Sequence, residues 1–280
     1  MTASAPPAPH RPAAGLPTRR PGFGNLLHAE WTKIRSVRST VWSLALLIVV
    51  TLGFTGLFTW LTVLQWSKAS PSDRAQLVSD PVSQILGSGL EFGQLTICVL
   101  GVLVITSEYS TGVIRASLLA VPKRLPMLAA KVVMFAALVF VIGECVTFPS
   151  FFIGAAILHS HAPVSLGDPG VARAVFGGGL YLTMLGLFAL AIGAIIRHTA
   201  GAITGVIAFV LVLAPLTQLI PGSIGKHIHA YLPSESGQLI GHAHQQSGEL
   251  LTPWQGFGVF ALWTAVLLAV AAYLLQRRDA

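Results

Sequence analysis

Charged side chains are scarce in this chain of 280 residues: only 10% are Asp, Glu, Lys or Arg, whereas 54% are hydrophobic. The mean hydropathy is +0.74. A water-soluble domain needs far more charge on its surface, so the composition indicates an integral membrane protein. Segments of about ten residues with alternating polarity, which mark a membrane β-barrel, are also missing. We therefore expect an all-α membrane protein.

Cysteine is scarce as well, with only Cys98 and Cys145, and each lies inside an apolar run. Because a free cysteine behaves as a small hydrophobic residue, we expect both thiols to be buried. The pair does not indicate a redox compartment.

Six apolar runs are long enough to cross a bilayer, for which about 20 residues are needed. We place the spans at 40–64, 87–106, 129–158, 174–196, 200–220 and 255–275. Pro149 falls inside the third span, where we expect it to kink the helix.

The chain before the first span has two parts. Residues 1–24 are rich in Pro, Ala and Arg and lack apolar periodicity, so we expect a disordered tail. Residues 25–38 predict a basic amphipathic helix on a membrane surface. Its apolar face comprises Leu26, Leu27, Trp31, Ile34 and Val37, and its basic residues are Lys33, Arg35 and Arg38. Glu30 interrupts the apolar face, so it needs a partner, either Lys33 or a neighbouring protein.

The basic residues are distributed unevenly between the two sides of the membrane. With the N-terminus inside, thirteen of the 17 Lys and Arg residues fall on the cytoplasmic side. The four outside are Lys68, Arg74, Arg173 and Lys226. The positive-inside rule therefore predicts that both termini are cytoplasmic. It also places the polar connection between the second and third spans in the cytoplasm.

This connection contains "VIRASLL" at residues 113–119, which predicts a short amphipathic helix between Gly112 and Pro122. Two explanations remain open. The helix could dock on a soluble partner, or Arg115 and its basic neighbours could anchor it to lipid headgroups.

Two motifs resemble the ABC-2 type permease subunits of actinobacterial ABC transporters. They are "AEWTKIRSVRST" before the first span and "SEYSTGVIRASLLAVPKR" after the second. The second motif departs from the usual pattern at its basic pair, which is Lys123-Arg124 instead of Arg-Arg. The resemblance covers nearly the whole chain.

The resemblance implies an exporter permease in a bacterial plasma membrane. Residues 25–38 would form an elbow helix, and residues 39–280 a six-span domain whose cytoplasmic coupling segment, 107–128, docks on a separate ATPase. A second permease subunit, identical or different, would complete the pathway. ATP and Mg would be bound by the ATPase, leaving this chain without a cofactor, and no nucleic-acid partner is expected. The implied coupling residues are Glu108, Tyr109, Gly112, Val113, Ile114, Arg115, Leu118, Leu119, Lys123 and Arg124.

The chain has no phosphate-binding loop of its own. Its nearest match, "PGSIGKHI" at residues 221–228, has too few residues between Gly222 and Gly225. It also has His227 where the motif requires Ser or Thr. ATP hydrolysis would therefore belong to a partner, and we do not expect this chain to be an enzyme.

Two acidic residues lie within the expected spans. Glu144 is midway along the third span, where a carboxylate costs about 3 kcal/mol or more. It could be a protonated group bonded to a neighbouring helix, or a polar lining or relay in a transport path. Glu91 is closer to the outer end of the second span, so we expect it to extend toward water.

Three His-x-His pairs lie in the expected outer segments: His159 with His161, His227 with His229, and His242 with His244. In an extended strand both rings of a pair would share one face and could bind Zn or Cu. On a helix they would point apart. No Cys, Asp or Glu stands beside them at ligand spacing, so we predict no metal site. His227, His229, His242 and His244 are the weak candidates.

Two rival functions remain. A secondary transporter would need no ATPase and predicts internal repeats or broken helices, which the sequence does not show clearly. A membrane-embedded, metal-dependent enzyme would use the histidines, but these lack a nucleophile or acid pair. The sequence does not identify the substrate.

Overall fold

The computed structural model describes residues 22–113, 124–246 and 248–277, which are helical and contain no strand. Within these ranges six helices are long and apolar enough to cross a membrane. They are α2 (Arg38–Leu64), α4 (Pro81–Ser110), α6 (Arg124–Leu158), α7 (Val171–Ile196), the composite Thr199–Gln218 and α12 (Pro253–Arg277). Five contain the whole run expected for them, and the composite helix ends two residues short of the expected 220. The protein is a multi-pass membrane protein, as the sequence predicts.

The N-terminal helix α1 (Phe23–Ser36) begins two residues before the expected 25, so the helix includes the last two residues assigned to the disordered tail. The rest of that tail, residues 1–21, lies outside the described residues. Val37 is extended, with φ −86° and ψ 108°, and separates α1 from α2. Arg38 therefore belongs to α2 instead of α1, which corrects the boundary expected from the sequence.

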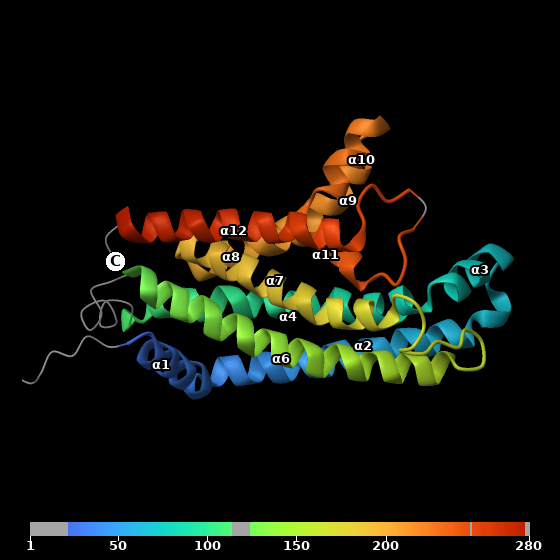
Figure 1. Ribbon diagram of the computed structural model, residues 1–280, viewed down its shortest axis with the longest axis horizontal. Coiled ribbons are helices and arrows are strands. Elements are labelled where there is room, and N and C mark those ends of the chain that lie inside the picture. Colours follow the sequence, from blue (N-terminus) through green and yellow to red (C-terminus); the bar gives the residue numbers. More distant parts are fainter. Residues whose placement is uncertain (1–21, 114–123, 247, 278–280) are drawn as a thin grey trace, which may run out of the picture.

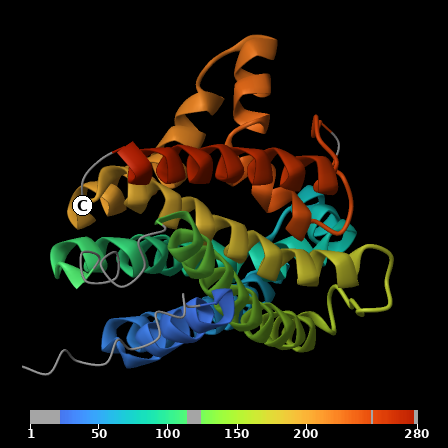
Figure 2. The same cartoon turned by 60° about the vertical axis from the view of Figure 1, so that its left-hand side comes forward.

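The long helices run side by side along the longest axis of the molecule (Figure 1). Helix α1 lies at one end of the bundle, together with the C-terminal ends of α4 and α12 and the start of α6. This end is called the α1 end below. Helix α3 (Pro71–Ser79) lies at the opposite end, called the α3 end. Figure 2 shows α4 and α7 between α2 on one side and α12 on the other.

The core of the bundle lies where α7 packs against α4, α6 and α12. Small residues allow this close packing. A Cβ added at Gly101 of α4 would lie 2.5 Å from the carbonyl oxygen of Gly186 on α7 and 2.8 Å from Ala189 Cβ. Cys98 is buried in this core, as expected, but Cys145 is exposed on α6, so the prediction of two buried thiols is wrong for Cys145.

The composite helix is not uniform. It consists of α8 (Thr199–Ile207), the π-helix η2 (Ala208–Leu213) and α9 (Ala214–Gln218). Pro215, in the first turn of α9, has no N–H to bond back into the preceding turn. The wider π turn therefore occurs where the regular α-helical bonding pattern is interrupted. From the sequence we expected one continuous span at residues 200–220 instead.

Beyond α9 the chain forms α10 (Gly222–Ala230), α11 (Pro233–Gln238) and the short 3-10 helix η3 (Leu239–Gly241). Another 3-10 helix, η1 (Trp66–Lys68), precedes α3. Helices α9 and α10 project from the flank of the bundle, whereas α11 returns to pack on α12 (Figure 1).

Candidate functional site

A buried cluster of four charged side chains lies at the α1 end. It joins Glu30 and Lys33 of α1 to Glu108 of α4 and Lys131 of α6. Glu30 and Lys131 are 3% and 2% exposed, so their charges are almost completely removed from solvent. This set is called the charge cluster below.

Opposite charges alternate within the charge cluster. Lys131 Nζ lies 2.5 Å from Glu30 Oε2 and 2.8 Å from Glu108 Oε1. Lys33 Nζ lies 2.7 Å from Glu30 Oε1 and 3.1 Å from Glu108 Oε1. Two lysines neutralise two glutamates, as buried charges require. The second oxygen of Glu108 is buried and has no hydrogen-bond partner among the described residues.

The charge cluster explains why Glu30 interrupts the apolar face of α1. The buried residues of this helix are Leu26, Glu30 and Ile34, which recur every four residues and face the bundle. Trp31 is 42% exposed and lies off this stripe. The expected pairing of Glu30 with Lys33 is confirmed. The more deeply buried partner is Lys131, which the sequence analysis used only as evidence for membrane orientation.

The ion pairs shift the titration of the two groups on α1. Burial acts to raise the pKa of Glu30, but Lys131 and Lys33 outweigh it and hold that pKa below its usual 4.5. Burial likewise acts to lower the pKa of Lys33, but Glu30 and Glu108 raise it above its usual 10.5. Both groups are therefore charged near neutral pH, and the charge cluster is fully ionised on its α1 side.

Other residues of the expected coupling segment make contacts within the bundle. The guanidinium of Arg197 lies over the Tyr109 ring, 5.0 Å from its centroid. Arg124 donates a hydrogen bond of 2.8 Å to the carbonyl oxygen of Leu275 near the end of α12. Arg124 therefore contacts a helix C-terminus within this chain, a contact that the sequence analysis did not expect.

The chain turns away from α4 at Gly112, whose φ of +72° is in the left-handed region that favours glycine. Val113 follows and is 42% exposed. The remaining expected coupling residues lie outside the described residues; they are Ile114, Arg115, Leu118, Leu119 and Lys123. On α1 and at the start of α2, Arg35 and Arg38 are exposed.

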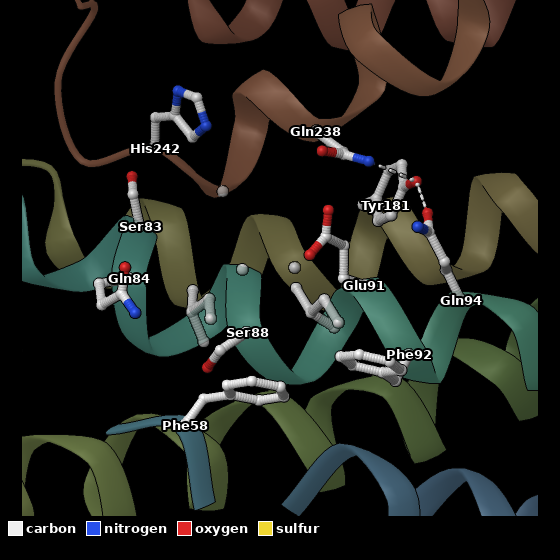
Figure 3. Close-up of a pocket in the computed structure, with 15 residues that line it drawn as sticks. Phe58, Ser83, Gln84, Ser88, Glu91, Phe92, Gln94, Tyr181, Gln238 and His242 are labelled. Carbon is white, nitrogen blue, oxygen red and sulfur yellow. Dashed lines mark hydrogen bonds between the residues drawn. The ribbon is translucent and has the colours of Figure 1, made fainter. Parts of the chain in front are cut away.

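A second feature lies nearer the α3 end, where α4 borders a cavity of about 420 Å³ (Figure 3). The polar residues that line it are Ser83, Gln84, Ser88, Glu91, Gln94, Tyr181, Gln238 and His242. Phe58 and Phe92 form part of its apolar wall. It is called the α4 cavity below.

Hydrogen bonds close one side of the α4 cavity. The Tyr181 hydroxyl donates to Gln94 Oε1 at 2.6 Å and accepts from Gln238 Nε2 at 3.4 Å, as Figure 3 shows. A larger cavity of about 970 Å³ shares Ser83 and Gln84 with it and extends toward α3. Together the two form a polar recess that reaches from the α3 end into the bundle.

The two intramembrane glutamates have different surroundings. Glu91 is exposed on α4, and Figure 3 shows its carboxylate directed into the α4 cavity toward the segment that carries Gln238. Glu144 is half-buried between α6 and α7. Its carboxyl lies against the backbone of α7 at Gly179, where an added Cβ would overlap it. Neither Glu144 oxygen has a hydrogen-bond partner in the described part of the chain. Glu144 does not line the α4 cavity.

The candidate metal ligands lie on different elements, His227 and His229 on α10 and His242 and His244 beyond η3. His227 and His229 are on helix α10, so the extended strand that a shared metal would require is not present there. His229 pairs with Glu235 at 3.3 Å, and His242 pairs with Glu249 at 2.8 Å. His244 lines the larger cavity. No group of three or more metal-ligating side chains occurs among the described residues.

Comparison with known proteins gives no family for this chain. It matches no protein-family model, and no curated protein matches it either.

Proposed function

We propose that this protein is the permease subunit of an ATP-driven exporter of the ABC-2 type, located in a bacterial plasma membrane. The observation that carries the proposal is the charge cluster. Glu108 lies at the start of the segment 107–128 that would dock on the ATPase, and Lys131 lies just after its end. Glu108 binds Lys33 of α1, and Lys131 binds Glu30 of α1. A displacement of this segment would therefore move α1, α4 and α6 together.

Helix α4 provides a route from that segment to the α4 cavity. It carries Glu108 at the α1 end and Glu91 in the cavity wall. The two residues are 17 positions apart, which corresponds to about 26 Å of α-helix. An α-helix transmits displacement along its axis, so closure of an ATPase at one end would alter the cavity near the other. ATP hydrolysis and Mg binding would remain with the partner.

The distribution of charge supports the orientation. With the α1 end in the cytoplasm, the basic residues obey the positive-inside rule and both termini are cytoplasmic. Helix α1 would then be the elbow helix at the inner membrane surface, with Arg35 and Arg38 exposed to lipid phosphates. A second permease subunit, the same or a different chain, would cover part of the bundle and complete the pathway.

One observation favours a second candidate, a secondary transporter driven by an ion gradient. The π-helix 208–213 interrupts the fifth span, and broken membrane helices are common in such transporters. This candidate needs no ATPase, so whether an ATPase is recovered together with this chain separates the two functions.

The experiment purifies the tagged full-length chain from its native membranes after chemical cross-linking and identifies its partners by mass spectrometry. We expect a subunit with a phosphate-binding loop. Ile114→Asp and Leu118→Asp should leave membrane insertion intact and abolish its recovery, because a few apolar side chains usually dominate an interface. The matched control is Val78→Asp on α3, an exposed valine at the opposite end of the bundle.

Replacing Arg115 and Lys123 with Gln tests the lipid-anchoring alternative. If the two Asp variants recover the ATPase and transport at the full rate, whereas transport is impaired in the Gln variants, segment 107–128 anchors to lipid and is not the docking site. If wild type recovers no ATPase at all, the proposed function is wrong.

A further inference from the structure

Glu91 occupies a position that lipid alone does not explain. It is the eleventh residue of α4, about 15 Å along the helix from Pro81. Its side chain is exposed and forms no hydrogen bond or ion pair with another described residue. A carboxylate at this depth is costly in hydrocarbon, so this face of α4 must border water or another protein. Ser88 and Gln84, one and two turns before Glu91, give the same face a polar surface.

The α4 cavity has an excess of negative charge. Among the described lining residues, no lysine or arginine faces Glu91. The imidazole of His242 is already bonded to Glu249, and the hydroxyl of Tyr181 is bonded to Gln94 and Gln238. Burial raises the pKa of nearby Glu235 against the opposing effect of His229, and the charge of Glu91 raises it further. The carboxylate of Glu91 is therefore not neutralised from within the cavity.

The adjoining larger cavity is also lined by more acidic than basic side chains. Asp73 and Asp80 line it, together with one arginine, Arg74. The guanidinium of Arg74 stacks 5.8 Å from the centroid of Trp66, and it donates a hydrogen bond of 2.9 Å to Ser67. The recess therefore presents carboxylates to its interior along its length, although the protein as a whole has a net charge of +7.

An aromatic stack forms the wall of the α4 cavity at the edge opposite the Glu91 carboxylate (Figure 3). Phe54 and Phe92 are parallel, with ring centroids 4.0 Å apart, and Phe58 lies 5.7 Å from each. Phe58 and Phe92 line the α4 cavity. The faces of aromatic rings carry partial negative charge and attract organic cations, most strongly where water is excluded. Since the Glu91 carboxylate and these rings line one cavity from opposite edges, a ligand that fills it would meet a negative charge at one edge and an apolar surface at the other.

We infer that the α4 cavity binds an organic cation that carries aromatic or apolar groups. Glu91 is its counter-ion, Phe58 and Phe92 contact its apolar part, and Gln94 and Gln238 accept or donate hydrogen bonds at the closed side. A volume of about 420 Å³ suits a small organic molecule. The identification of this cation as exported cargo rests on the proposed function, whereas its binding does not.

The test uses two probes of the same shape and opposite charge, tetraphenylphosphonium and tetraphenylborate. Equilibrium binding of each is measured to the purified full-length protein in lipid nanodiscs, with empty nanodiscs subtracted and no ATP or ATPase present. We expect saturable binding of the cation and none of the anion. Equal binding of both ions to wild type would overturn the inference, whatever the behaviour of any variant.

Matched variants then locate the binding site. Glu91→Gln keeps the size of the side chain and removes its charge, so the affinity for the cation should fall by roughly tenfold. Glu91→Asp retains the charge and should bind within a few-fold of wild type. Phe92→Leu should weaken binding by several-fold through loss of the ring face. Glu144→Gln makes the same chemical change outside the cavity and should leave the affinity unchanged.

The outcomes distinguish this inference from the proposed function. If Glu91→Gln and Glu144→Gln both bind the cation as tightly as wild type does, Glu91 is not its counter-ion and the inferred binding site is wrong. That result would leave the proposed function intact, because recovery of the ATPase tests it separately. If the cation binds through Glu91 but no ATPase is recovered from native membranes, the binding site stands and the proposed function fails.

Discussion

Lys131 should be the most important residue of the charge cluster for stability. In Lys131→Met the side chain keeps nearly the same length and loses only its charge and hydrogen bonds. Glu30 and Glu108 then remain buried with Lys33 as their only cationic partner in the cluster. Removing one member of a buried ion pair usually costs about 3–5 kcal/mol, because it leaves an uncompensated charge.

Lys33→Met is the matched control because Lys33 binds the same two carboxylates. Its side chain is 31% exposed, compared with 2% for Lys131. Solvent screens an exposed pair, so we expect this variant to cost about 1 kcal/mol or less. At about 2–4 °C for each kcal/mol, Lys131→Met should lower the midpoint of thermal unfolding by on the order of 10 °C and Lys33→Met by only a few degrees.

The assay follows helical circular dichroism of the purified protein during heating, together with hydrogen exchange of the α1 amides. The effect of pH gives a second readout. Since the folded-state pKa of Glu30 is lowered, its contribution to stability is present above pH 4.5 and is lost as the pH falls below that value. Without Lys131, Lys33 alone opposes the effect of burial on the pKa of Glu30, so that pKa should be higher in the variant than in wild type. Acidification should therefore narrow the difference in unfolding free energy between the variant and wild type.

Equal small shifts for the two Met variants would refute this reasoning. That result would mean that the ion pairs of Lys131 contribute no more than those of the partly exposed Lys33. Faster hydrogen exchange in α1 confined to Lys131→Met would support it, because Lys131 joins α1 to the start of α6.

Three further predictions concern other parts of the bundle. If Glu144 is a relay, transport should be lost with both Gln and Ala, whereas loss with Ala alone would indicate a structural role. Gly101→Ala should destabilise the protein by about 1–3 kcal/mol, since its Cβ would overlap α7, while Gly53→Ala, which has open space around it, should be neutral in the same unfolding assay. Cysteines introduced at 67–80 should react with an impermeant maleimide from outside, and one at Ala280 should not; the reverse pattern would overturn the orientation.

The spans could be predicted from the sequence because membrane crossing is decided by local properties. A run of about 20 apolar residues suffices, and the neighbours of each run in space do not matter. The partner of Glu30 could be predicted only in part. Lys33 is one turn away on the same helix, so helical periodicity identifies it. Lys131 is far away in the sequence and contacts Glu30 only once α1 has folded against α6.

The sequence did contain a signal that Lys131 needs a partner. Lys131 is the third residue of the expected span 129–158, where an unpaired charge is costly. Its burial depends on the angle between α1 and α6, which residue patterns do not specify. The α4 cavity likewise depends on how α2, α4, α7 and α11 meet. The π-helix before Pro215 could not be separated from an ordinary proline-containing helix by composition alone.

The central claim is that ATP acts on one end of the bundle and changes the α4 cavity near the other. We would measure the rate at which a maleimide labels Ser88→Cys, a residue of that cavity, in a Cys145→Ala background. The sample is the complex of this chain with its ATPase, purified from native membranes into nanodiscs. We predict that ATP, Mg and vanadate together change the labelling rate, and that Ile114→Asp removes the change. An unchanged rate in the intact complex would contradict the account.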